Sequence, residues 1–131
     1  MMISRLSFET KRIEIVEGRG KERYLAFFYK VDGQTITDDE YNPANAYDVM
    51  DKEAAEKKLV VLLHCGCGFW ECSAVVARVS ETSEGLIQWT VSHYRLRDVI
   101  SEYFFKSEEY DKTMAEIQTI AKEEIQRIEK N

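Results

Sequence analysis

The chain has 131 residues, a mass of 15.3 kDa and 44% hydrophobic residues, enough for one globular domain with its own core. Its single proline and six glycines argue against disordered and low-complexity classes of protein. The net charge of −6 disfavours nonspecific binding to nucleic-acid phosphates. We therefore expect one domain over residues 1–131.

The N-terminal region and the cysteines predict a cytoplasmic protein. Charged side chains at Glu9, Lys11 and Arg12 interrupt the apolar region that a signal peptide would need. The longest apolar run, residues 59–63, is too short to cross a bilayer. Three cysteines are an odd number, which excludes a fully paired secreted framework and favours reduced thiols.

The first 37 residues predict an antiparallel hairpin or meander. Residues 12–15 alternate with period two, glycines at 18 and 20 mark a turn, and residues 24–31 are rich in β-formers. Asp32-Gly33 is a strong turn signal, and residues 35–37 can begin a short returning strand.

Residues 38–53 are strongly acidic. One base, Lys52, faces six carboxylates there, so this segment carries −5 of the net charge of the chain. The six are Asp38, Asp39, Glu40, Asp48, Asp51 and Glu53. They lack the spacing and central glycine of an EF-hand, so we interpret them as a solvated acidic surface. Asn42-Pro43 marks a loop, and residues 46–57 predict a short helix.

The central block predicts three antiparallel strands in a meander. Residues 59–63 are apolar on both faces, which is typical of a strand inside a sheet. Residues 73–79 form a second predicted strand. In the third, Ile87, Trp89 and Val91 alternate with polar residues, and Glu84-Gly85 supplies the turn before it.

The C-terminal region predicts a helix of about twenty residues that begins at a Ser107 cap. Its apolar stripe consists of Tyr110, Met114, Ile117, Ala121, Ile125 and Ile128. On the polar side, Glu123 and Arg127 are spaced to form an ion pair. The complete prediction is an α+β fold: an antiparallel sheet of about five to six strands, packed by this long helix and a short middle helix.

A cysteine-rich turn over residues 63–72 is the most distinctive motif in the chain. Cys65 and Cys67 are expected on one face of a strand, with Cys72 opposite Cys67 across the mouth of the turn. His93 continues the buried face of a later strand and can join the three thiols, whereas His64 points to the other face.

Four interpretations of this turn remain open. The cysteines can pack as small apolar residues beneath Phe69 and Trp70. Alternatively, Cys67 and Cys72 can form a disulfide or redox switch, or one cysteine can be a nucleophile assisted by a histidine. The fourth interpretation is a zinc site, for which the candidate ligands are Cys65, Cys67, Cys72 and His93.

Several of these motifs together resemble a group of small bacterial proteins. That group combines a C-x-C-G turn and a nearby third cysteine with a V/I-x-W strand and a final helix led by aromatic residues. The matching segments here are residues 62–68 with Cys72, residues 87–89, Phe104-Phe105 and Tyr110. Residues 29–33 also suit the hairpin of that group. The resemblance implies no particular reaction.

The sequence favours a binding module over an enzyme. A glycine-rich phosphate loop, an H-E-x-x-H motif and a G-x-S-x-G motif are all absent. Aromatic residues near Arg95 and Arg97 can stack on bases, but the overall acidity argues against a nucleic-acid partner. We expect a non-enzymatic module that binds a basic protein, by analogy with bacterial toxin-neutralising proteins. The alternative is a zinc-binding or thiol-redox protein, and a homodimer is compatible with either function.

Overall fold

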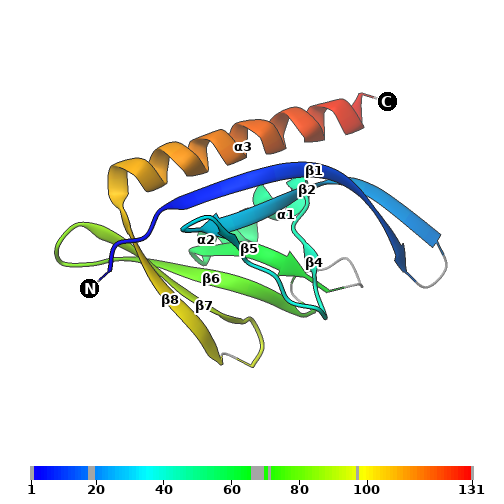
Figure 1. Ribbon diagram of the computed structural model, residues 1–131. Coiled ribbons are helices and arrows are strands. Elements are labelled where there is room, and N and C mark those ends of the chain that lie inside the picture. The colour runs from blue at the N-terminus through cyan, green and yellow to red at the C-terminus, as the bar shows by residue number, and fades with distance from the viewer. Residues whose placement is uncertain (1, 18–19, 66–69, 71, 97, 131) are drawn as a thin grey trace.

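Two antiparallel sheets and a long C-terminal helix form the α+β fold that the sequence predicts (Figure 1). The computed structural model describes residues 2–17, 20–65, 70, 72–96 and 98–130; for residues 16, 17 and 20–22 it describes the backbone. The first sheet contains β1 (Leu6–Glu17), β2 (Gly20–Val31) and β3 (Gln34–Thr35). The second contains β4 (Asn42–Pro43), β5 (Leu59–His64), β6 (Ala74–Glu81), β7 (Leu86–His93) and β8 (Val99–Lys106). The helices are α1 (Ala46–Val49), α2 (Lys52–Glu56) and α3 (Ser107–Glu129).

The first sheet is built on a long hairpin. β1 and β2 pair without a break from Leu6 opposite Val31 to Glu17 opposite Gly20. The turn that leads to β3 consists of Asp32 and Gly33, whose φ angles are 52° and 81°. Two positive φ angles in a two-residue loop match the right-handed twist of the flanking strands, which explains the Asp-Gly pair.

Two isolated bridges join the sheets at their edges. Ser4 N–H donates to the carbonyl of Phe104 in β8 at 2.7 Å, and the N–H of Phe27 in β2 donates to the carbonyl of Ala44, next to β4, at 2.9 Å. Backbone pairing therefore runs from β8 through residue 4 to the hairpin, and through residue 44 back to the five-stranded sheet. The strands form a ring, and α3 lies along the hairpin (Figure 1).

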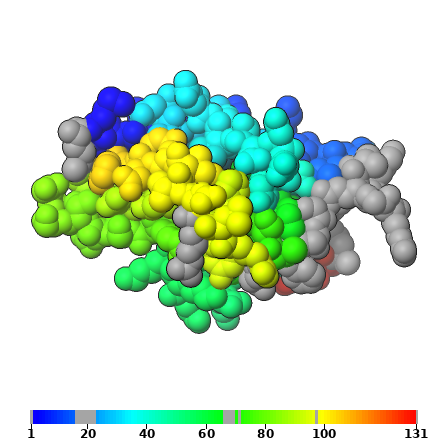
Figure 2. Space-filling view, turned by 90° about the horizontal axis from the view of Figure 1, so that it is seen from below, coloured from blue at the N-terminus to red at the C-terminus, as the bar shows by residue number. Residues whose placement is uncertain are grey.

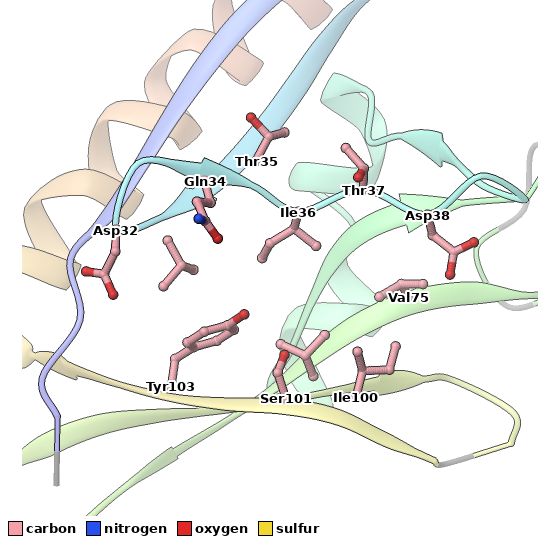
Figure 3. A pocket seen from close by; sticks show the side chains of 12 residues that line it. Asp32, Gln34, Thr35, Ile36, Thr37, Asp38, Val75, Ile100, Ser101 and Tyr103 are labelled. Atoms are coloured by element: carbon pink, nitrogen blue, oxygen red, sulfur yellow. The ribbon is translucent and has the colours of Figure 1, made fainter.

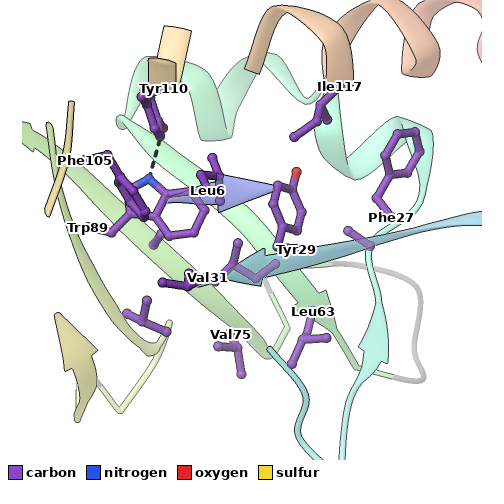
Figure 4. Close-up of a cluster of buried hydrophobic side chains, with 14 of the residues drawn as sticks. Leu6, Phe27, Tyr29, Val31, Leu63, Val75, Trp89, Phe105, Tyr110 and Ile117 are labelled. Atoms are coloured by element: carbon purple, nitrogen blue, oxygen red, sulfur yellow. Dashed lines mark hydrogen bonds between the residues drawn. The ribbon is translucent and has the colours of Figure 1, made fainter. Parts of the chain in front are cut away.

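The main core lies between the hairpin, the five-stranded sheet and α3 (Figure 4). Trp89 is fully buried, and its indole N–H donates to the Tyr110 hydroxyl at 3.0 Å. Its ring makes edge contacts with Phe105 and Tyr29 at centroid distances of 5.2 and 6.1 Å. These aromatic contacts connect β7, β8, β2 and α3, so they hold the layers of the molecule together.

A second cluster covers the other face of the five-stranded sheet. Ala54 of α2 packs there with residues of β5 and β6 and with Trp70. Trp70 is buried and meets the Tyr94 ring edge-on at 5.0 Å. β5 therefore contributes to both clusters, as expected for a strand that is apolar on both faces.

Three local predictions need correction. The middle helix is two helices, because Asp51 has an extended backbone and its carboxylate accepts the Ala54 N–H at 2.9 Å, which starts α2 afresh. Lys106, not Ser107, precedes the first helical residue of α3, and it provides no side-chain cap. The predicted meander of three strands is extended by β4 and β8. Within the described ranges, the structure has no helix long and apolar enough to span a membrane.

Candidate functional site

The acidic turn, which we define as residues 38–40, presents carboxylates at the surface after β3. Asp39 and Glu40 are exposed, and the Asp38 side chain is 29% exposed. The Asp38 carboxylate accepts the Glu40 N–H at 3.0 Å, and its carbonyl accepts the Tyr41 N–H at 3.0 Å. This local turn holds three successive acidic residues together at the surface.

Asp48 belongs to the interior, although the sequence grouped it with the surface carboxylates. It is 7% exposed and, together with Asn45, forms a capping box on α1. Its Oδ2 accepts the Asn45 N–H at 3.0 Å and lies 2.7 Å from Nδ1 of the buried His64. The two side chains satisfy each other inside the protein, so neither is available to a partner. The Asn45-x-x-Asp48 spacing is the sequence signal for this role.

The two remaining acidic candidates lie on α2 and have local partners. Asp51 is half-buried and caps the helix, as described above. Glu53 is exposed and lies 3.3 Å from the Lys57 ammonium. The pKa of Lys57 is raised, first by its hydrogen bond to Tyr94 and then by that to Glu53. Asp48, Asp51 and Glu53 therefore have partners within the protein, whereas Asp39 and Glu40 in the acidic turn are exposed at the surface.

A groove lies beside the acidic turn, between the chain after β2 and the strands β7 and β8 (Figure 3). Its volume is about 420 Å³, and Val31, Ile36, Val75, Val91, Ile100 and Tyr103 supply its apolar lining. The charged residues that line it, Asp32 and Asp38, are both acidic. In Figure 2 the cyan segment after β2 and the yellow β7–β8 hairpin lie side by side on one face of the molecule. The groove and the acidic turn form a continuous site on that face.

The cysteine turn is described in part. Cys65 follows β5 and is half-buried. Its N–H donates to the Ser73 carbonyl at 3.1 Å, so Ser73 and the neighbouring Cys72 lie across from it, on the chain that leads into β6. Cys72 is exposed. Cys67, required by both the zinc and the disulfide interpretations, lies outside the described residues.

His93 contacts the acidic turn. Its Nε2 lies 3.5 Å from Asp38 Oδ2, and its ring packs against Tyr41 at a centroid distance of 5.7 Å. The Tyr41 hydroxyl in turn lies 2.7 Å from Ser73 Oγ, next to Cys72. Among the described residues, no three His, Cys, Asp or Glu side chains form a group suited to a metal ion. The zinc site therefore stays a prediction, which metal analysis of protein purified without chelator would test.

Sequence reasoning missed β8 and with it one wall of the groove. Residues 99–106 read Val-Ile-Ser-Glu-Tyr-Phe-Phe-Lys, which are mostly β-formers, so the strand propensity was present. The turn before β8 lacks the glycine or proline that would mark it. The strand was therefore missed because no turn signal precedes it, and not because its residues disfavour a strand.

Comparison of the chain with protein-family models, curated proteins and solved structures found no match. The charge, exposure and geometry of the groove and the acidic turn therefore provide the basis for a functional proposal.

Proposed function

We propose that the protein is a non-enzymatic, cytoplasmic binding module that docks a basic surface of a partner protein on its acidic turn. The observation that carries the proposal is the acidic turn, whose Asp39 and Glu40 are exposed, beside a groove whose charged lining residues are both acidic. Such a surface attracts cations at long range and repels anions, which gives both speed and selectivity to association. The odd cysteine count supports the cytoplasmic location, and a basic bacterial toxin is one partner with this chemistry.

The test compares two triple variants with the same net charge. D38N/D39N/E40Q neutralises the acidic turn, and the asparagine at 38 retains an oxygen that can accept the Glu40 N–H. E116Q/E123Q/E129Q neutralises three exposed carboxylates on α3. Each immobilised protein captures partners from an extract of the organism that encodes it, and the affinity of a purified partner is then measured by calorimetry.

We expect the wild type and the α3 variant to bind the same basic partner, with the acidic-turn variant about tenfold weaker or worse. Raising the salt from about 0.05 M to 0.3 M should weaken wild-type binding, because it screens exposed charges. Equal binding by both variants, or no partner at low salt, would contradict the proposal.

A further inference from the structure

The groove is bordered by an unpaired strand edge. β8 is the last strand of the five-stranded sheet, and its outer side meets residue 4 at the Phe104–Phe105 end. Over Val99–Tyr103, the part of the chain that the structure describes places no strand against this outer side. An unpaired edge presents backbone donors and acceptors to any chain that can lie along it.

The backbone groups of Glu102 face this open side. Successive residues of a strand direct their N–H and C=O groups to alternate sides. The Phe104 carbonyl accepts from Ser4 on the outer side, so Glu102, two residues earlier, directs its N–H and C=O to the same side. Ile100 is the extra residue of a bulge between Val99 and Ser101. The open edge therefore extends about 16 Å over five residues.

The opposite wall is also a strand without a second neighbour. β3 pairs with β2 on one side, and in the described structure its other side faces the groove. Figure 3 shows the segment from Gln34 to Asp38 running across from β8, with Tyr103 and Ser101 directed into the space between them. The ring of strands is thus closed at residue 4 and open beside β3, where an extended chain can enter.

Exposed apolar side chains lie at the start of β8 and in the turn before it, and one of them, Ile100, lines the groove. Leu96, Val99 and Ile100 are 71%, 60% and 50% exposed, three of the seven large hydrophobic residues exposed within the described ranges. Such a concentration on an open edge is typical of an interaction surface. Burying it requires apolar side chains from the occupant.

The acidic residues in and near the groove favour a basic occupant. Asp32 and Asp38 line the groove, and the exposed Asp39 and Glu40 follow Asp38 in the chain. A second copy of this protein on the same edge would bring these carboxylates together, which is unfavourable. A basic segment would gain from all of them.

We propose that an extended segment of a partner protein, with basic residues alternating with apolar ones, binds in the groove and adds a strand to β8. This inference rests on the proposed function and specifies the binding mode and the chemistry of the bound segment. Main-chain hydrogen bonds to the β8 edge would provide affinity, while the apolar groove and its carboxylates would provide specificity.

The test selects twelve-residue peptides from a random displayed library for binding to the wild-type protein. The acidic-turn variant, D38N/D39N/E40Q, is present as a soluble competitor, so that peptides which do not need these carboxylates are removed. We expect enriched peptides to be basic with alternating apolar residues, and to shift the amide resonances of residues 34–36 and 99–103. N-methylation of alternate backbone amides in such a peptide should weaken its binding about tenfold or more, because strand addition needs those donors.

A matched pair of protein variants tests the edge itself. E102P removes the outward N–H at a position where an edge strand tolerates proline, and should weaken peptide binding about tenfold or more. E102Q keeps that N–H and should stay within about fivefold of the wild type. Circular dichroism establishes that both variants fold; if E102P does not, the N-methylated peptide alone decides.

Four outcomes would overturn the strand-addition proposal: no enriched peptides, enriched peptides without basic residues, binders that shift other resonances, and binders insensitive to N-methylation. A dimer of the protein that E102P converts to a monomer would assign the edge to a second copy instead. If salt-sensitive binding to a basic partner persists while these peptide tests fail, the proposed function stands and the strand mode alone falls.

Discussion

Two buried tyrosines, Tyr29 and Tyr110, differ in whether the hydroxyl has a hydrogen-bond partner. The Tyr110 hydroxyl accepts the Trp89 N–H at 3.0 Å, whereas the buried Tyr29 hydroxyl has no partner among the described residues. Burial raises the pKa of both tyrosines, so both hydroxyls stay neutral at pH 7. The two hydroxyls should therefore contribute to stability with opposite sign.

We predict that Y29F raises the free energy of unfolding by about 1 kcal/mol and that Y110F lowers it by about 1 to 2 kcal/mol. Y29F removes a buried hydroxyl without a partner, and Y110F deprives the buried indole N–H of its acceptor. Urea unfolding of the two variants measures both changes. A loss of stability of similar size in Y29F would show that its hydroxyl has a partner, such as a buried water.

A second residue-scale feature is the buried Glu124 carboxylate, which joins α3 to β1. It accepts two hydrogen bonds from Arg127, both at 2.9 Å, and two from Arg12 at 2.9 and 3.0 Å. The hydrogen bonds from Arg127 and then Arg12 lower its pKa from 4.5 to about 2, against the opposing effect of burial. The sequence had paired Arg127 with Glu123; the carboxylate that Arg127 binds through two nitrogens is Glu124.

We predict that E124Q lowers the free energy of unfolding by about 1 to 2 kcal/mol at pH 7, because charge-assisted bonds are lost while both arginines keep access to water. Because the pKa of Glu124 is lower in the folded state than its ordinary value of 4.5, the ionised carboxylate stabilises the folded protein above pH 4.5. This contribution disappears as the pH falls towards 2. Urea unfolding between pH 7 and pH 2.5 should therefore show the difference between wild type and E124Q shrinking. E123Q, an exposed neighbour, is the control, and a pH-independent difference would contradict the assignment.

At the scale of one element, α3 shows how its apolar stripe is used. Ile117 and Ala121 are fully buried, Met114 and Ile125 are half-buried, and Ile128 is 39% exposed. After Ala121 the burial of the stripe thus decreases towards the C-terminal end of the helix, through Ile125 to Ile128. All residues of the stripe are apolar, so the sequence alone does not show that their burial differs.

The gradient predicts different costs for the same substitution at two positions of α3. I117A removes fully buried methyl and methylene groups and should cost about 3 kcal/mol, including the cavity it creates. I128A should cost less than about 1 kcal/mol, because that side chain already contacts solvent. Chemical denaturation measures both. Equal costs would mean that the end of α3 is covered, for example by a second copy of the protein.

For the whole molecule, the ring of strands makes the two sheets depend on each other. The hairpin supplies Phe27 and Tyr29 to the same core cluster that contains Trp89 of the other sheet. Neither sheet can bury its apolar face without the other, so they should unfold together.

We predict a single calorimetric transition for the complete chain, with an enthalpy of about 90 kcal/mol near 60 °C. The calorimetric and van't Hoff enthalpies should agree within error, as they do for one cooperative domain. Two separated transitions would show instead that the hairpin and the five-stranded sheet are independent units.

Most of the fold follows from local patterns that depend only on backbone geometry. The apolar stripe of α3 has the helical period, the strands show alternating or continuous apolar character, and Asp32-Gly33 forms the turn it predicts. The acidic turn was also accessible, because residues 38–40 are consecutive carboxylates. These features do not depend on which distant element packs against them.

Other features were decided by tertiary structure. Periodicity reports that a side chain is buried, but it does not report its partner or which strand lies at the edge of a sheet. Asp48 is interior because β5 brings His64 to it, and the groove exists because the ring of strands closes at residue 4 and stays open beside β3. Long-range packing thus turned a uniform acidic segment into one buried pair and one exposed turn beside an open strand edge.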